Sequence, residues 1–180
     1  MNTHIGNVVL IVGKPAGCRT TQLLMGKKRP KKKDDQNRKR KKIGSNCWVP
    51  PGGGTESYDK SQKHAAQREI LQETGLSFPL KSFKKVGVLR GFISSQTEPL
   101  WIVHLYLVVE KFNRLFVFGE EYVDMKWFPV TKLPFRHMLP GDIYWIPRLI
   151  KGEMLAVDLC FKDEVGVLES KDIRAIDSFN

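Results

Sequence analysis

The chain has few cysteines and no long apolar run, and both scarcities limit what it can be. Its three cysteines are odd in number and far apart, which favours a reduced compartment and a cytoplasmic location. No stretch approaches the roughly 20 apolar residues of a membrane-spanning helix, so we expect no membrane association. The apolar run at residues 8–12 is too short for a signal-peptide core, and we expect a buried strand there.

Recognisable zinc ligands are missing as well. None of the four histidines pairs with a cysteine at the spacing of a zinc site. We expect structural or exposed positions for His4, His64, His104 and Cys160. Internal repeats are absent, and 180 residues with 41% hydrophobic content predict one globular domain, which we expect to be a monomer.

Acidic residues are outnumbered, 19 against 30 basic ones, but the excess is confined to one segment. Residues 27–42, the basic tract, hold eleven Lys and Arg against two Asp. The tract therefore contributes +9 (11 − 2) of the net charge of +11 and leaves +2 (11 − 9) for the rest. It has no aliphatic or aromatic residue to pack, which predicts a mobile insertion at about 27–46.

Three interpretations of the basic tract stay open. It is a solvated loop, a nuclear localisation signal formed by two basic clusters, or a non-specific nucleic-acid-binding segment. Nucleic-acid binding by the folded domain is not favoured, because such a domain would spread positive charge over several elements.

Apolar patterns predict an α/β layered domain with a mixed sheet and few helices. A helix is expected at residues 61–74, with Ser61 as N-cap and Gly75 as its C-terminal stop. A second is expected at 142–150, although Pro147 disfavours it. Strands are expected at 7–13, 21–26, 47–49, 83–92, 100–109, 122–128, 154–161 and 165–168.

The stretch at residues 52–76 carries the chemistry. Glu69 and Glu73 are four residues apart, so their carboxylates share one helical face and repel each other. A divalent cation would reverse that cost, and Mg²⁺ prefers oxygen ligands shared with phosphates. Glycines at 52–54 let the backbone approach a phosphate chain. The alternatives are a solvated helix face and a simple turn.

This stretch resembles the Nudix signature: Gly, five residues, Glu, seven residues, Arg-Glu, an apolar residue, any residue, Glu-Glu, any residue, Gly and an apolar residue. The glycines at 52–54 match its start, and its second half is matched by Arg68, Glu69, Ile70, Glu73, Gly75 and Leu76. The resemblance implies the Nudix fold, a mixed sheet between helices, and hydrolysis of a phosphate–phosphate bond.

The chain departs from the signature at two positions. One residue is inserted, so the first Glu position falls on Lys60 or Asp59, and Asp59 is the candidate replacement acid. The first Glu of the Glu-Glu pair is Gln72, whose amide oxygen carries no charge. The change to Gln72 removes one anionic contact that the signature would offer to a metal.

By resemblance, Mg²⁺, or Mn²⁺ in its place, is the cofactor, with Arg68 orienting the carboxylates and Glu69 also serving as base. The implied or candidate metal ligands are the Gly53 carbonyl, Glu69, Glu73, Gln72, Asp59, Glu120 and Glu121.

Outside the signature, residues 23–29 resemble the second strand of MutT-type enzymes. Residues 127–128, 133–135, 138–142 and 144–145 resemble the C-terminal part of family members that act on oxidised purine nucleoside triphosphates. The resemblance points to Asp142 as the reader of the base, where related enzymes have two adjacent acids and this chain has Gly141 first. Helix N-cap is the alternative role for Asp142. Leu139 stands where those enzymes have a stacking Trp. The Asn that they have in the purine pocket, soon after the position of Trp48, is replaced here by Val49 or Pro50. Trp145 and Trp101 are the candidate aromatic walls, and Gly54 a candidate substrate contact.

The sequence thus predicts a Mg²⁺-dependent nucleoside triphosphate pyrophosphohydrolase. Two other functions stay open. One is hydrolysis of a dinucleoside polyphosphate or an RNA cap, in which the basic tract would hold RNA. The other is a weakly catalytic domain that binds nucleotide or RNA, which the changes at Lys60 and Gln72 favour.

Overall fold

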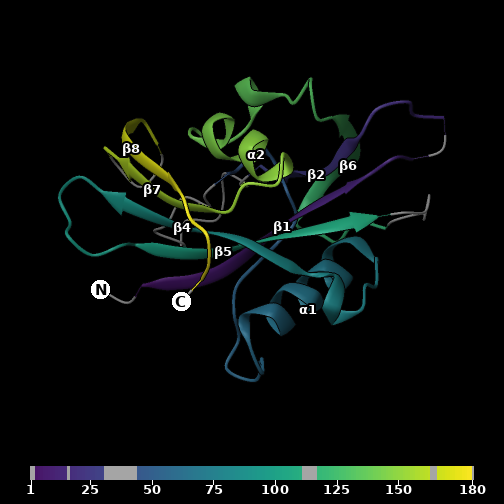
Figure 1. The fold of residues 1–180 in the computed structure, drawn as a ribbon, viewed down its shortest axis with the longest axis horizontal. Coiled ribbons are helices and arrows are strands. Elements are labelled where there is room, and N and C mark those ends of the chain that lie inside the picture. The colour runs from purple at the N-terminus through teal and green to yellow at the C-terminus, as the bar shows by residue number, and fades with distance from the viewer. Residues whose placement is uncertain (1–2, 16, 31–43, 111–116, 163–165, 180) are drawn as a thin grey trace.

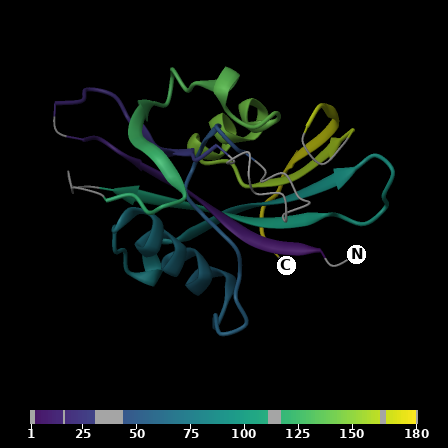
Figure 2. The ribbon, with the colours of Figure 1, turned by 180° about the vertical axis from the view of Figure 1, so that it is seen from behind.

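The computed structural model describes residues 3–15, 17–30, 44–110, 117–162 and 166–179. Within them, an eight-stranded mixed sheet lies between two α-helices, as expected (Figures 1 and 2). The strand order is β3-β2-β1-β5-β4-β7-β8, and β6 pairs with β2. The elements are β1 (His4–Gly13), β2 (Gln22–Lys28), β3 (Trp48–Val49), α1 (Gln62–Thr74), η1 (Leu80–Ser82), β4 (Lys84–Ile93), β5 (Trp101–Glu110), β6 (Tyr122–Pro129), η2 (Phe135–His137), α2 (Asp142–Ile150), β7 (Leu155–Phe161) and β8 (Leu168–Ala175).

β1 lies at the centre of the sheet and is covered on both faces. It pairs in parallel with β5 along its whole length, and β4 pairs in parallel with β7. Because strand side chains alternate, Leu10 and Val12 enter the core beneath α2, while Val9 and Ile11 enter the core beneath α1. This two-sided burial explains the unbroken apolar run in the sequence.

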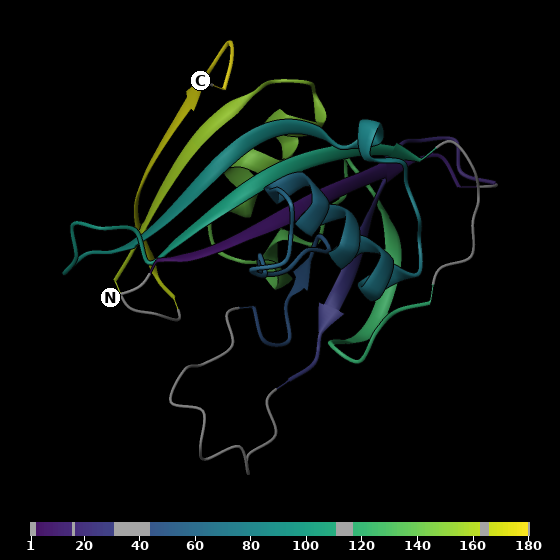
Figure 3. The ribbon, with the colours of Figure 1, turned by 90° about the horizontal axis from the view of Figure 1, so that it is seen from below.

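α1 crosses one face of the sheet, as seen from below in Figure 3. Its ends are those expected: the Ser61 side chain accepts a hydrogen bond from the His64 N–H, and Gly75 adopts φ +67°. Ala66 and Ile70 are fully buried in the core on that face. Small and apolar residues on the inner side of α1 therefore fix which of its side chains face the sheet.

α2 covers the opposite face, and the expected helix is confirmed despite Pro147. Proline removes the N–H that would bond the carbonyl four residues earlier, on Ile143. That residue is 49% exposed, so water can satisfy its carbonyl. None of the helices in the described part of the chain is both long and apolar enough to cross a membrane.

Two expectations at the edges of the fold need correction. The strand expected at 165–168 is wrong, because the closing strand is β8, which starts at Leu168. β8 is an edge strand exposed along most of its length, so it lacks the apolar alternation that would reveal it. The basic tract does not begin outside the fold either: Lys27 and Lys28 belong to β2. The expected mobility concerns mainly residues 31–43, which lie outside the described residues.

Candidate active site

The glycine-rich loop lies along the first half of β1. The Asn7 N–H donates to the Gly53 carbonyl at 2.8 Å. At Gly52 φ is +153°, and a Cβ there would lie 2.2 Å from the Asn7 carbonyl oxygen, so a side chain cannot be accommodated. A Cβ on Gly53 would lie 2.4 Å from Oε2 of Glu69. The loop therefore passes directly between β1 and the carboxylates of α1.

Arg68 holds the outer side of the site together. Its Nε and Nη2 donate to the two oxygens of Asp59 at 3.0 and 2.7 Å, and Nη2 also donates to the Gly54 carbonyl at 3.1 Å. Its Nη1 donates to Glu69 Oε1 at 2.7 Å and to Gln72 Oε1 at 3.1 Å. The paired guanidinium lowers the pKa of Asp59 below its usual value. All donors of one arginine thus fix two carboxylates, an amide and the glycine loop.

Glu73 is the buried carboxylate of the site, with an exposed fraction of 6%. Its Oε2 accepts hydrogen bonds from the Gly52 N–H at 2.7 Å and the Tyr122 hydroxyl at 2.9 Å. Burial raises the pKa of Glu73 to about 8, and the nearby carboxylate of Glu121 adds to the rise, whereas those hydrogen bonds and Lys28 oppose it. Glu73 therefore requires a positive partner if it is to be ionised at neutral pH.

The loop before β6 brings one of its two glutamates to this region. Glu121 Oε1 lies 3.0 Å from Lys28 Nζ, and its charge acts on Glu73. Glu120 is exposed, and its backbone carbonyl accepts a hydrogen bond from Arg29 Nε at 2.9 Å. Of the two glutamates, Glu121 is therefore the one whose carboxylate acts on Glu73.

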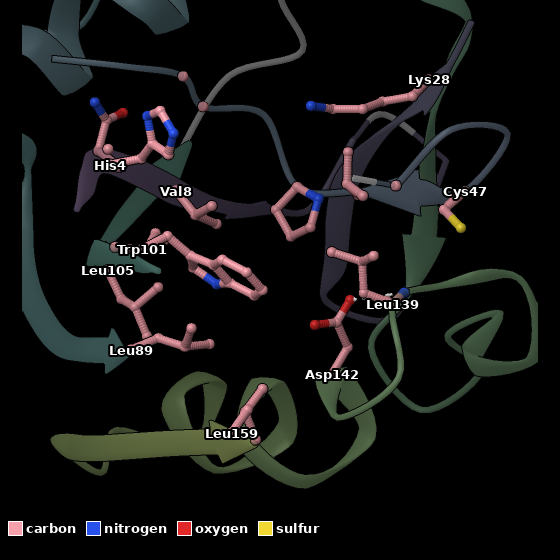
Figure 4. Close-up of a pocket in the computed structure, with 18 of the residues that line it drawn as sticks. His4, Val8, Lys28, Cys47, Leu89, Trp101, Leu105, Leu139, Asp142 and Leu159 are labelled. Carbon is pink, nitrogen blue, oxygen red and sulfur yellow. Dashed lines mark hydrogen bonds between the residues drawn. The ribbon is translucent and has the colours of Figure 1, made fainter. Parts of the chain in front are cut away.

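A cavity of about 640 Å³ opens beside the glycine loop, between the sheet and α2. Figure 4 shows Trp101 extending into it from β5, opposite Asp142 and Leu139. The cavity brings together every residue predicted to bind substrate: Gly54, Trp101, Leu139, Asp142 and Trp145. Gly53 and Lys28 line the same cavity, so it reaches the edge of the carboxylate site.

Asp142 is 4% exposed and is the acidic residue in the lining of the cavity. Burial raises its pKa to about 8, partly offset by the Leu139 N–H, which donates to Oδ2 at 3.2 Å. The N-cap alternative is wrong, because Gly141 is the N-cap and Asp142 is already helical. Gly141 has φ +104°, a conformation that residues with a side chain rarely adopt, so an acid at this position would be strained.

Comparison with known proteins agrees with this geometry. A family model for the NUDIX domain matches residues 19–149. The chain belongs to the Nudix family.

Two curated Nudix relatives are similar over most of this chain. The oxidized purine nucleoside triphosphate hydrolase of Mus musculus is 29% identical over 145 residues, covering 78% of this chain and 86% of the relative. That of Danio rerio is 26% identical over 133 residues, covering 74% and 81%. Among solved structures, the MutT protein of Bacillus halodurans superposes with a TM-score of 0.66 at 17% identity, over 94% of this chain and 97% of that one. The last likeness shows the fold.

The structure places three signature residues, Arg68, Glu69 and Glu73, against the glycine loop. Asp59, one candidate for the displaced Glu, binds Arg68 through both oxygens. Gln72 also binds Arg68, and it is exposed. Among the described residues, no group of three or more His, Cys, Asp or Glu side chains is gathered as a metal cluster. The predicted ligand roles therefore remain predictions.

Sequence reasoning missed two residues of this Nudix site. Lys28 was assigned to the basic tract and, by resemblance, to the second strand, but not to the site, although it is half-buried at the end of β2 and lines the cavity. Tyr122 was assigned only to a strand, although its hydroxyl binds Glu73. Tyr122 is 49 residues from Glu73 along the chain, so no local pattern could pair them. Leu23 to Met25 form a continuous apolar run without alternation, so the pattern of β2 alone did not assign a face to Lys28.

Proposed function

We propose that this Nudix protein is a Mg²⁺-dependent pyrophosphohydrolase that cleaves purine nucleoside triphosphates, oxidised ones included, to the monophosphate and pyrophosphate. One observation carries the proposal: a single cavity is lined by Asp142 at one end and by the signature loop at the other. A base held near Asp142 would direct its phosphates toward Glu69 and Glu73. The names of the mouse and zebrafish relatives support the same substrate class.

The end of the cavity near Asp142, where the base would bind, is lined mainly by apolar side chains. Trp101 supplies an aromatic face, and Leu139 lies beside Asp142 (Figure 4). With its raised pKa, the Asp142 carboxyl is protonated at neutral pH and donates a hydrogen bond to an acceptor on the base edge. The second oxygen accepts from a base N–H. Such a pairing suits the purine edge, which carries both kinds of group.

At the phosphate end, the cavity is lined by the Lys28 side chain and by the backbone of the glycine loop. Lys28 stands at the cavity wall within reach of Glu121, with which it is paired. Its ammonium group would bind a non-bridging phosphate oxygen. Gly54 is exposed at the same wall, where no side chain blocks a phosphate. These groups hold the polyphosphate against the carboxylate face of α1.

The carboxylates fit a divalent cation. Oε1 of Glu73 is buried and has no hydrogen-bond partner within the described residues, so it is an oxygen that lacks a positive or donor neighbour. Glu69 has one oxygen on Arg68 and the other against Gly53. Mg²⁺, or Mn²⁺ in its place, would be held by Glu69, Glu73, the second lone pair of the Gly53 carbonyl and Glu121. When bound, the cation neutralises polyphosphate charge and activates water.

Asp59 and Gln72 have a different part in this proposal. Their side-chain oxygens accept hydrogen bonds from Arg68, and Arg68 in turn donates to Glu69. We therefore assign them to orienting Arg68. A neutral Gln72 is sufficient for that task, because it needs only one acceptor oxygen.

Glu69 acts as the base in this proposal. It accepts a proton from the attacking water as the water oxygen bonds to the α-phosphorus. The bond from the α-phosphorus to the oxygen that bridges to the β-phosphate breaks. The leaving group departs as pyrophosphate, and the bonding electrons stay on its oxygen. Lys28 and the glycine loop keep the polyphosphate in place during this exchange.

Product analysis tests the proposal. The full chain is incubated with Mg²⁺ and a panel of dGTP, 8-oxo-dGTP, dATP, dCTP, a dinucleoside tetraphosphate and a capped RNA, and nucleotides, phosphate and pyrophosphate are separated by chromatography. We expect a purine monophosphate and pyrophosphate in equal amounts, and loss of turnover in EDTA. Turnover confined to the dinucleotide or capped RNA, or tight binding without turnover, would contradict it.

Glu73 is the buried acid on which the proposed cation site depends. Glu73→Gln should abolish turnover while leaving thermal unfolding near that of the wild type, because the amide keeps the Gly52 and Tyr122 contacts but cannot hold a cation. Steady-state kinetics and circular dichroism measure the two effects. Glu98→Gln, at an exposed position between β4 and β5, is the matched control and should keep wild-type turnover. Wild-type turnover in Glu73→Gln would show that the carboxylate site is misplaced.

A further inference from the structure

The two oxygens of Glu73 have different surroundings. Oε2 accepts both hydrogen bonds that the carboxylate receives, from the Gly52 N–H and the Tyr122 hydroxyl. Oε1 is buried with no partner in the described part of the chain. Because both donors hold Oε2, the carboxylate cannot rotate freely. Oε1 therefore stays the oxygen without a partner.

Tyr122 is itself held in place by β2. Its side chain is fully buried, and its ring lies directly on Gly26, where a Cβ would come within 2.4 Å of the ring atom Cδ1. Any side chain at residue 26 would therefore displace the ring. The absence of a side chain on Gly26 is what lets Tyr122 reach across to Glu73.

The chain around Tyr122 also holds the backbone of Glu73. The Gly119 N–H donates to the Glu73 carbonyl at 3.0 Å, and the Val117 N–H donates to the Thr74 carbonyl at 3.0 Å. The Tyr122 N–H in turn donates to the Gly119 carbonyl at 3.2 Å. Residues 117–122 therefore hold the end of α1 by its backbone and Glu73 by its side chain.

We propose that Tyr122 is a positioning residue whose hydroxyl, seated on Gly26, fixes Glu73 so that Oε1 is the oxygen offered to the divalent cation. This inference rests on the proposed function, because it assumes that Glu73 binds a cation. It adds that the geometry of the site depends on β2 and β6, which lie far from the signature in sequence. Outer partners of this kind typically alter metal affinity roughly ten- to hundredfold when removed.

The test measures the binding of Mn²⁺ alone to the full chain by electron paramagnetic resonance, without nucleotide. Tyr122→Phe removes only the hydroxyl and should weaken Mn²⁺ binding about tenfold or more, with the fold retained by circular dichroism. Gly26→Ala should act in the same direction by pushing the ring away. Tyr106→Phe is the matched control, because Tyr106 is buried in the same core and should bind Mn²⁺ like the wild type.

A double-mutant cycle separates positioning from general destabilisation. If Tyr122 acts through Glu73, adding Tyr122→Phe to Glu73→Gln should cause no further loss of Mn²⁺ affinity. Wild-type Mn²⁺ affinity in Tyr122→Phe, or fully additive losses in the double variant, would overturn the positioning role. Unchanged Mn²⁺ affinity in Glu73→Gln would instead overturn the proposed metal site, so the two failures are distinguishable.

Discussion

At the scale of single residues, Arg68 makes a helix face with two acids tolerable. Two ionised acids one turn apart would repel each other and cost an isolated helix a few tenths of a kcal/mol. Arg68 binds Glu69 directly and is itself fixed by Asp59. The positive charge is therefore directed at one acid, and the other, Glu73, is left with neutral donors on one oxygen.

Replacement of Arg68 by Lys should expose this dependence. Lysine keeps the charge but cannot donate in a planar fork, so it cannot hold Asp59 and Glu69 together. Arg68→Lys should lower kcat roughly ten- to hundredfold, as expected for loss of an orienting partner. The control is Arg90→Lys, which alters a similar fork to Asp158 on the distant strands β4 and β7. Equal kcat values for the two variants would contradict the orienting role.

At the scale of elements, the glycine loop and α1 act as one unit. The loop supplies the Gly52 N–H to Glu73, and its Gly53 backbone lies against Glu69. Spacing within one helix and its preceding loop is visible in the sequence, which is why the signature predicted this unit with its cap at Ser61. Contacts between elements are not visible in this way, so Tyr122 and its seat on Gly26 escaped prediction.

Gly52→Ala should destabilise this unit more than Gly54→Ala does. Alanine at φ +153° is strained, and its Cβ would meet the Asn7 carbonyl oxygen at 2.2 Å. The loop must shift, so we expect a free energy of unfolding lower by about 1–3 kcal/mol and loss of most turnover. Urea titration measures the first and product formation the second. Gly54→Ala, where a Cβ meets nothing within 4 Å, should keep the wild-type free energy of unfolding.

At the scale of the whole molecule, the sheet joins two halves of a site that are far apart in sequence. β1 carries the glycine loop along its first half, and α2 delivers Asp142 to the cavity on the other side of the sheet from α1. The sequence predicted the mixed sheet and both helices because buried strands and caps leave local patterns. It did not predict the parallel pairing of β1 with β5 or the exposed edge strand β8, because pairing partners and polar edges leave none.

Placing Asp142 in an apolar cavity predicts a pH dependence for the metal-free protein. Its folded pKa of about 8 lies above the value of about 3.9 in the unfolded chain. The folded state therefore holds the extra proton between these values, and the contribution of Asp142 to the free energy of unfolding decreases as pH rises from about 4 to about 8. Glu73, whose pKa burial also raises, acts in the same direction, and His104, whose pKa burial lowers, acts in the opposite direction. Wild type and Asp142→Asn must therefore be compared to isolate the contribution of Asp142. The difference in their free energies of unfolding, measured by urea titration in EDTA, should shift in favour of Asp142→Asn with rising pH, by at most about 1.4 kcal/mol per pH unit. Parallel curves for the two proteins would mean that Asp142 is ionised in the folded state, and that the cavity is more polar than its lining indicates.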